Sequence, residues 1–134
     1  MTQEDKELLL LKDLSARLPY GVKVHINSPI EEQNSMELFD VNFNSKHIGV
    51  GNEKWAFRAI PIIDDEDEAK VVKPYLRPMS SMTEEEKREY QAFFNYDGVE
   101  YPEEYIDWLN AHHFDFHNLI GRGLAIDCTG LNIY

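Results

Sequence analysis

The sequence predicts a single α+β domain over residues 1–134: an N-terminal helix, an antiparallel sheet or small SH3-like barrel, two to three C-terminal helices and a returning strand. Three observations favour this class. A leucine-rich amphipathic segment comes first, period-two apolar patterns follow it, and helix start signals recur near the C-terminus. The length of 134 residues suits one core, and 43% hydrophobic with 28% charged residues is an ordinary globular composition.

The first element is expected to be a helix over residues 3–18. Thr2 and Asp5 have the spacing of a capping box, with Asp in place of the usual Glu or Gln. Residues 19–21, Pro-Tyr-Gly, are expected to end the helix. Leucines three or four residues apart predict one apolar face, formed by Leu8, Leu11, Leu14 and Leu18.

The next segments alternate between apolar and polar residues. Residues 22–26, 36–43 and 54–63 are expected to be strands, and the glycine-containing stretch 44–53 is expected to hold a turn. Short polar turns between such runs predict an antiparallel meander. The side chains expected on the buried faces are Val22, Val24, Ile26, Phe39, Val41, Phe43, Trp55, Phe57 and Ala59.

Two prolines interrupt the chain after the sheet. Residues 71–72 are expected to form a short strand. Pro74 and Pro78 follow, and proline fits neither a helix interior nor a central strand. The segment that contains them is therefore expected to be an extended connector across the surface.

The C-terminal third carries several helix signals. Thr83 and Glu86 form a capping box at the start of a helix that is expected to run to about Phe94. Pro102 suits the first position of a second helix, which is expected to end near residues 111–112. The side chains that the first of these helices is expected to bury are Tyr90, Phe93 and Phe94.

The chain after the second helix is expected to form one more short helix and a strand. Asp115 is a suitable N-cap for a helix over residues 116–120, and Gly121 would end it. Leu124, Ile126 and Cys128 alternate, and this pattern predicts the returning strand.

Charge limits the partners. The net charge is −12, from 25 acids and 13 bases, and residues 64–107 alone hold 14 acids and 5 bases. Such a field repels nucleic-acid phosphates and anionic membranes, so we expect no direct binding to either, whereas a basic protein surface would suit it. The candidate contact is the acidic run Asp64, Asp65, Glu66, Asp67 and Glu68, although such a run is more typical of a solvated turn.

Compartment and cofactor use are also constrained. Cys128 is the single cysteine, so an intramolecular disulfide and a cysteine-based zinc knuckle are excluded. The N-terminus has acids where a signal peptide has basic residues, and the apolar run at residues 8–11 is far shorter than the roughly 20 residues of a membrane span. We therefore expect a cytoplasmic protein, and we expect no cofactor.

The segment DWLNAHHFDFHNLIGRG, residues 107–123, contains the candidate chemistry. His113 and His117 are four residues apart, as in zinc-binding helices, and Asp107 or Asp115 would complete a three-ligand set. That reading makes the protein a metal-dependent hydrolase that uses the cluster from His112 to His117. It requires an unbroken helix, however, and Asp115 is a better N-cap, so the alternative is that His112 and His113 cap the preceding helix.

Two stretches, residues 73–90 and 107–134, together with KDLSARLPYGVKV at residues 12–24, resemble a family of short uncharacterised proteins. That family is encoded in the genomes of anaerobic gut bacteria and their phages or mobile elements. The resemblance covers over half of the chain and leaves out residues 27–64. It implies a bacterial or phage cytoplasmic context and no particular activity.

These observations favour a non-enzymatic, acidic protein-binding accessory factor of phage or mobile-element origin, because no catalytic constellation beyond the histidines is present. Two alternatives stay open. One is the metal-dependent hydrolase described above. The other is a mimic of nucleic acid, in which the acids of residues 64–107 line one face and occupy a basic host protein.

Overall fold

The computed structural model describes residues 1–64, 66–67, 69–95, 98–99 and 102–134. Its helices and strands, in chain order, are α1 (Gln3–Arg17), β1 (Lys23–His25), β2 (Met36–Asn42), β3 (His47–Gly51), β4 (Ala56–Pro61), β5 (Lys73–Leu76), α2 (Glu84–Gln91), β6 (Phe94–Asn95), β7 (Gly98–Val99), α3 (Pro102–Ala111) and β8 (Ile126–Asp127). Short 3₁₀ turns lie at Leu18–Tyr20, Glu31–Gln33 and Met79–Ser81.

The predicted α+β class is confirmed. Six strands form one sheet in the order β4-β3-β2-β1-β5-β8, and every pairing is antiparallel except that of β5 with β8. The sheet is a half-barrel with β4 and β8 at its two edges, so the antiparallel sheet is the alternative that forms. The returning strand β8 is short, and it pairs with the middle of the chain rather than extending the meander.

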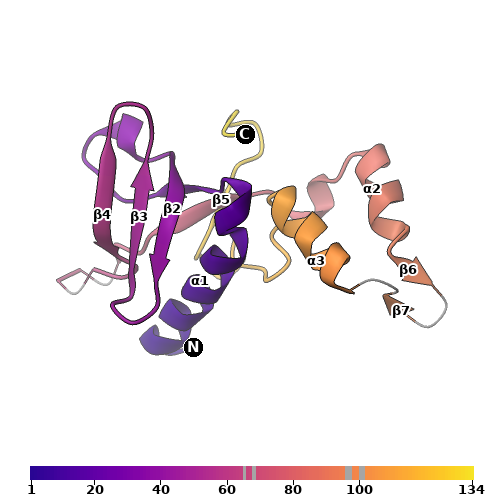
Figure 1. The fold of residues 1–134 in the computed structure, drawn as a ribbon, viewed down its shortest axis with the longest axis horizontal. Helices are drawn as coiled ribbons and strands as arrows, with labels where there is room; N and C mark the ends of the chain where they lie inside the picture. Colours follow the sequence, from indigo (N-terminus) through magenta and orange to yellow (C-terminus); the bar gives the residue numbers. More distant parts are fainter. Residues whose placement is uncertain (65, 68, 96–97, 100–101) are drawn as a thin grey trace.

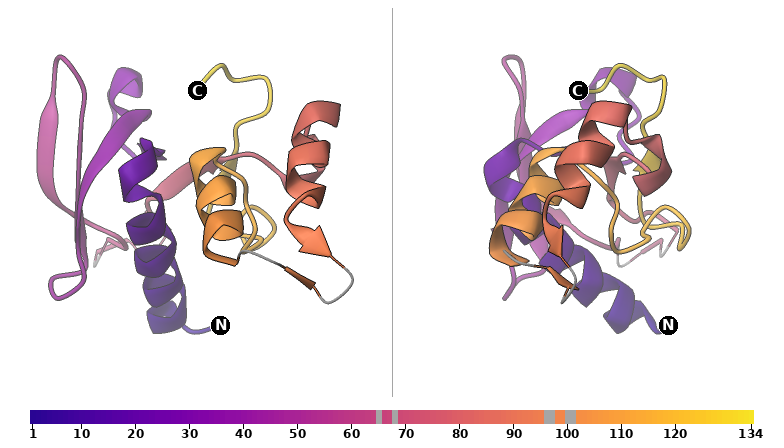
Figure 2. Two further views of the ribbon diagram at one scale, coloured as in Figure 1. Left: turned by 45° about the vertical axis from the view of Figure 1, so that its right-hand side comes forward. Right: turned by 90° about the vertical axis from the view of Figure 1, so that its right-hand side faces the viewer.

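The layers are visible in Figure 1, where α1 lies between the strands and α3, and α2 lies at the far end from the sheet. The left view of Figure 2, turned by 45°, keeps this order. Helix α1 contacts both β2 and α3. α3 therefore lies between α2 and the layer formed by α1 and the sheet.

Helix α1 begins as predicted, with the Thr2 and Asp5 capping box formed in both directions. Its buried face differs from the prediction, because Leu8 is 47% exposed. The buried stripe has the i, i+3, i+4, i+7 spacing of a core-facing helix and consists of Leu10, Asp13, Leu14 and Arg17, with Leu11 beside it. A charged pair therefore occupies the face that packs on the protein.

The buried face of β2 was predicted in the wrong register. Met36 and Leu38 are 1% and 2% exposed, whereas Phe39 is 39% exposed. A bulge follows Leu38 and adds one residue, which brings Val41 back toward the core. The Phe39 ring lies over Gly49, where an added Cβ would come within 2.8 Å of it, so this position of β3 accommodates only glycine without a shift.

The turn expected within residues 44–53 forms at residues 43–46, and β3, which was not predicted, follows it. Phe43 lies beyond β2 and is 46% exposed, contrary to the prediction. Trp55, just before β4, and Phe57 within it pack against the core as predicted, but Ala59 is exposed with φ +58°. The β3–β4 register shifts at this point, so Ile60 takes the inner place.

The proline-containing segment is a strand and not a surface connector. β5 lies between β1 and β8, and Pro74 within it is buried. Proline is tolerated because the β8 pairing begins only at Tyr75, so Pro74 has a strand partner, Val24, on one side alone. Val71 makes only an isolated bridge with Ile63.

The main core is aliphatic and lies between α1 and the sheet. Its fully buried members come from α1, the strands and the C-terminal segment: Leu10, Leu14, Val22, Val24, Ile48, Val50, Ile62, Leu76 and Leu119. No helix in the described parts of the chain has the length and apolar character that crossing a membrane requires.

Candidate functional site

The histidine segment follows α3, and its backbone rules out one continuous helix. α3 ends at Ala111, and His113 has φ +62°. The His113 N–H bonds the Asn110 carbonyl, and the Phe114 N–H bonds the Leu109 carbonyl, which is a Schellman motif with His113 in the position that glycine usually takes. Leu109 and Phe114, which complete the motif, are both fully buried. The chain therefore turns sharply between His113 and His117.

The predicted capping role is confirmed for His112 and wrong for His113. The His112 Nδ1–H donates to the Trp108 carbonyl at 2.9 Å. The His113 ring instead stacks on Tyr134, with 3.6 Å between the ring centroids and 9° between the planes. Its Nδ1 is buried without a hydrogen-bond partner among the described residues.

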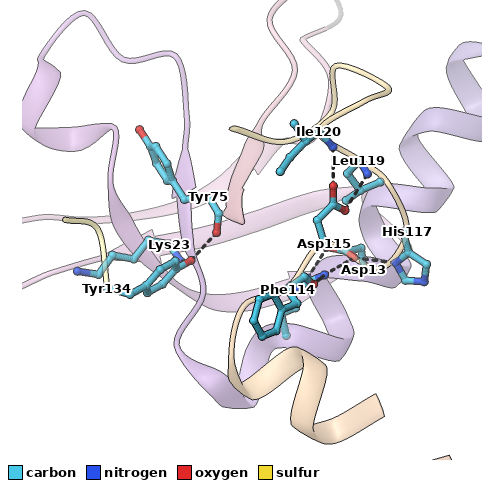
Figure 3. Close-up of polar contacts among 10 residues, drawn as sticks. Asp13, Lys23, Tyr75, Phe114, Asp115, His117, Leu119, Ile120 and Tyr134 are labelled. Carbon is cyan, nitrogen blue, oxygen red and sulfur yellow. Dashed lines mark hydrogen bonds and ion pairs between the residues drawn. The ribbon is translucent and has the colours of Figure 1, made fainter. Parts of the chain in front are cut away.

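Tyr134 connects this stack to the sheet. Its hydroxyl accepts from the Lys23 N–H at 2.8 Å and donates to the Tyr75 carbonyl at 2.8 Å, so it links β1 to β5 (Figure 3). Burial raises the pKa of this phenol above its ordinary value. The aromatic pair of Tyr134 and His113 is thus a structural contact between the C-terminal segment and the end of α3.

His117 points in another direction, toward α1. Its Nδ1–H donates to Asp13 at 2.8 Å, as Figure 3 shows. Arg17 binds the same carboxylate through Nε at 2.8 Å and also donates to the Phe114 carbonyl at 2.8 Å. Burial would raise the pKa of Asp13, but the hydrogen bond from His117 and the charge of Arg17 outweigh it, so the pKa lies below its ordinary value.

The two candidate aspartate ligands are also engaged elsewhere. Asp115 is buried and accepts the Leu119 and Ile120 N–H groups at 2.8 and 2.9 Å (Figure 3). It caps a turn, and the helix predicted over residues 116–120 does not form. Asp107 is exposed and lies beside Tyr20. The pKa of the Tyr20 phenol is raised, first by desolvation and then by the Asp107 carboxylate.

The four candidate ligands therefore have four different surroundings. His113 contacts Tyr134, His117 contacts Asp13, Asp115 binds backbone amides and Asp107 lies beside Tyr20. Across the described ranges, no group of three or more His, Cys, Asp or Glu side chains is arranged to hold a metal ion.

His113 makes folding stability depend on pH. Burial, followed by the charges of Arg17 and Arg77, lowers its pKa from 6.5 to about 4. The unfolded chain therefore binds this proton more readily, and we expect stability to fall as pH drops from 6.5 toward 4, by about 2 kcal/mol for a half-buried ring. His113→Phe keeps a ring against Tyr134 and removes the titration. Urea unfolding between pH 7 and 4 should show a shallower loss for this variant, and parallel curves would contradict the prediction.

In the acidic run at residues 64–68, the described side chains of Asp64 and Asp67 accept nearby backbone N–H groups. Asp64 accepts the Glu66 N–H at 2.8 Å, and Asp67 accepts the Ala69 N–H at 3.1 Å. Glu66 and Asp67 are exposed. Asp65 and Glu68, which belong to the same predicted contact, lie outside the described residues.

A second acidic region carries features that the turn lacks. We call the segment from α2 to α3, residues 84–111, the aromatic arm. Not one residue of α2 is buried. Tyr90 of α2, with Phe93 and Phe94 just after it, packs on Tyr105 and Trp108 of α3 in an aromatic cluster whose ring centroids are 5.1 to 6.1 Å apart. None of these five rings is buried, and none belongs to the main core.

Polar contacts hold the rings of the cluster in place. The Tyr90 and Tyr105 hydroxyls are 3.3 Å apart, and the Trp108 indole N–H donates to Glu89 at 3.1 Å. Desolvation, and then the hydrogen bond with Tyr90, raise the pKa of Tyr105 to about 12. The cluster presents apolar surface at its edge, where Phe94 is 40% exposed and Ile106 is 37% exposed.

Carboxylates surround this cluster. Residues 84–111 contain nine acids and two bases, a net charge of −7 in 28 residues. The described acids of the arm that are exposed are Glu84, Glu85, Glu89, Glu103, Glu104 and Asp107. The arm therefore combines half-exposed aromatic rings with one sign of charge, a composition that suits a protein contact.

An ion pair fixes the arm to the end of β5. Arg77 forks onto Glu86 with contacts of 2.7 and 2.8 Å, and its guanidinium lies over the Phe114 ring at 4.3 Å. The Thr83 N–H also donates to Glu86 at 2.9 Å. The hydrogen bond from Arg77 is the main reason that the pKa of Glu86 falls to about 2. The start of α2 is thus held by the Arg77–Glu86 ion pair, and its end is held by the packing of Tyr90 in the aromatic cluster.

Comparison with models of protein families, with curated proteins and with solved structures finds no match for this chain. The arm was not singled out by the sequence reasoning, which treated its aromatics as buried. The available signal was the concentration of seven aromatic residues among nine acids within residues 84–111.

Proposed function

We propose that this chain is a non-enzymatic protein-binding accessory factor that contacts a basic partner through the aromatic arm. The observation that carries the proposal is that α2 has no buried residue. The aromatic rings between α2 and α3 stay partly exposed, and exposed carboxylates surround them. Tyrosine and tryptophan are enriched at the centres of protein interfaces, where they supply large contact area at low entropy cost.

Charge gives the expected chemistry of the partner. Six exposed carboxylates on the arm would attract a surface rich in lysine and arginine and speed the encounter at low ionic strength. The rings would then supply the apolar contact that a purely charged surface lacks. The resemblance noted above suggests that the chain is of phage or mobile-element origin, so lysates of anaerobic gut bacteria are the source in which to search for the partner.

The nucleic-acid mimic is less well supported. A mimic requires its acids in one continuous row, whereas the turn at residues 66–67 and helix α2 lie at opposite ends of the long axis in Figure 1. The described acids of residues 64–107 therefore form two separate groups rather than one face. The arm alone is a compact surface and suits a protein contact better.

The experiment places a photo-crosslinking amino acid at Phe94 in the arm and, in a matched variant, at Phe39 on the sheet. These two side chains are 40% and 39% exposed, so a difference in adducts reports on location and not on accessibility. Adducts from host lysate are identified by mass spectrometry and the partner is then purified. We expect a specific adduct at Phe94 and none at Phe39, and the reverse pattern would refute the arm as the contact.

Association rates with the purified partner then test charge. Glu103→Gln with Glu104→Gln removes two exposed carboxylates from the arm, and Glu31→Gln with Glu32→Gln removes two exposed carboxylates elsewhere. We expect the arm pair to slow association about tenfold at low salt, and less at high salt, because steering is screened. Equal effects from both pairs would show that only net charge matters.

A further inference from the structure

A cavity outside the arm is lined by cations, in contrast to the acidic arm. It has a volume of about 340 Å³ and lies between the first turns of α1, the segment around β5 and the loop that precedes β8. Three cationic side chains line it: Lys6 from α1, Lys73 from β5 and Arg122 from the loop. No carboxylate belongs to its described lining residues.

These three cations are not neutralised within the described part of the chain. The salt bridges of the described residues involve Arg17, Lys46, Arg77, Lys87 and His117, and none involves a cation of the cavity. The chain as a whole is acidic, with 25 acids and 13 bases. A cavity lined by three bases without an ion-pair partner therefore differs from the rest of the chain. Like charges repel each other, and an anion between them would remove that cost.

The three cations lie on separate elements whose backbone is hydrogen-bonded or paired at each position. Lys6 lies in the capped first turns of α1, where its N–H bonds the Thr2 carbonyl. Lys73 is paired with His25 in the sheet. The Arg122 N–H is shared between the Asn118 and Leu119 carbonyls. A site built on a helix, a strand and a tight turn needs little rearrangement to bind a ligand.

We propose that this cavity binds a small anion of the phosphate class, such as inorganic phosphate or the phosphate group of a small metabolite. Lysine and arginine are the side chains that bind phosphate through charge-assisted hydrogen bonds, and the volume falls within the range of small-ligand pockets. The proposal does not depend on the function proposed for the arm.

The surroundings of the cavity select for a small ligand over a polyanion. The acidic turn is next to it in the fold, because the Asp64 N–H bonds the carbonyl of Lys70, and Ala69 and Val71 on either side of Lys70 line the cavity. A nucleic acid extending beyond the cavity would meet this turn and the field of a chain with net charge −12. A phosphate-sized anion inside the cavity faces the three cations at short range.

The test is titration of the purified chain with inorganic phosphate and with pyrophosphate at constant ionic strength, followed by ¹H–¹⁵N NMR shifts. We expect saturable shifts at residues lining the cavity, with a dissociation constant on the order of 1 mM or tighter. Pyrophosphate should bind more tightly because it carries more charge. Chloride at equal ionic strength should produce no saturable shift.

Two double variants with the same change in net charge separate the site from general electrostatics. Lys6→Gln with Arg122→Gln removes two cations of the cavity, and Lys12→Gln with Arg88→Gln removes two exposed cations elsewhere. We expect about tenfold weaker phosphate binding for the first pair and under about twofold for the second. NMR spectra without phosphate report whether both remain folded.

Three outcomes would overturn the proposal. They are no saturable shift for the wild-type chain, shifts located away from the cavity, and equal weakening by the two double variants. Replacement of Glu66 and Asp67 by Gln and Asn adds an independent measurement. Because these exposed acids lie on the turn beside the cavity, their neutralisation should tighten phosphate binding, and unchanged affinity would contradict the proposed location.

Discussion

Replacing Arg17 by methionine is expected to lower the free energy of unfolding by about 3–5 kcal/mol. Arg17 and Asp13 both have fully buried side chains, and Nε of Arg17 lies 2.8 Å from the Asp13 carboxylate. Methionine would fill much of the space but would leave Asp13 charged and buried, with only the hydrogen bond from His117. It would also remove the donor to the Phe114 carbonyl.

The control is the double variant Asp13→Leu with Arg17→Met, which removes both charges together. Replacing a buried ion pair by apolar residues of similar size is often close to neutral, so we expect the double variant to be more stable than Arg17→Met alone. Urea unfolding of the wild-type chain, both single variants and the double variant gives the coupling energy. Additive losses would show that the pair does not act as a unit.

Replacing Phe114 by alanine is expected to destabilise the protein by about 3–5 kcal/mol, the range for large aromatic truncations in cores. Phe114 is fully buried and contacts three parts of the molecule. Its ring stacks on Trp108 at 5.6 Å and lies under Arg77 at 4.3 Å, and its carbonyl accepts from Arg17. The truncation would leave a cavity where the arm joins the rest of the protein.

Phe114→Leu is the matched variant, because it keeps an apolar side chain of intermediate size. We expect a smaller loss than with alanine, with the difference following the volume removed. Trp108 fluorescence would report loosening of the arm, and urea unfolding would report global stability. An alanine variant that loses less than about 1 kcal/mol would show that the site collapses without cost.

Local signals in the sequence were sufficient for the starts of α1, α2 and α3, but not for the end of α2, which stops at Gln91 rather than near Phe94, nor for residues 116–120, which form no helix. The two capping boxes depend on residues three apart, Thr2 with Asp5 and Thr83 with Glu86, and both form as predicted. Pro102 begins α3 for the same local reason. The α+β class followed from the order of the periodic patterns, because period and length are also local properties.

Register and burial required the tertiary structure. The outward position of Phe39 depends on a bulge in β2. The inclusion of Pro74 in β5 depends on the β8 pairing, which begins only at Tyr75. In both cases the deciding contacts are pairings with another strand, which the residues of β2 or β5 alone do not specify. An alternating apolar pattern does not show where a β-bulge adds a residue to a strand. The rule that proline avoids central strands does not show which side of a strand lacks a hydrogen-bonding neighbour.

The histidine cluster shows the same division. Asp115 was recognised as a break in the helix from its type and place, and α3 does end before it. The partners of His113 and His117 are Tyr134 and Asp13, 21 and 104 residues away, and no local spacing predicts them. The sequence by itself determined the helix caps, the fold class and the charge. Only the tertiary structure decided which side chains meet, because packing brings together residues from distant parts of the chain.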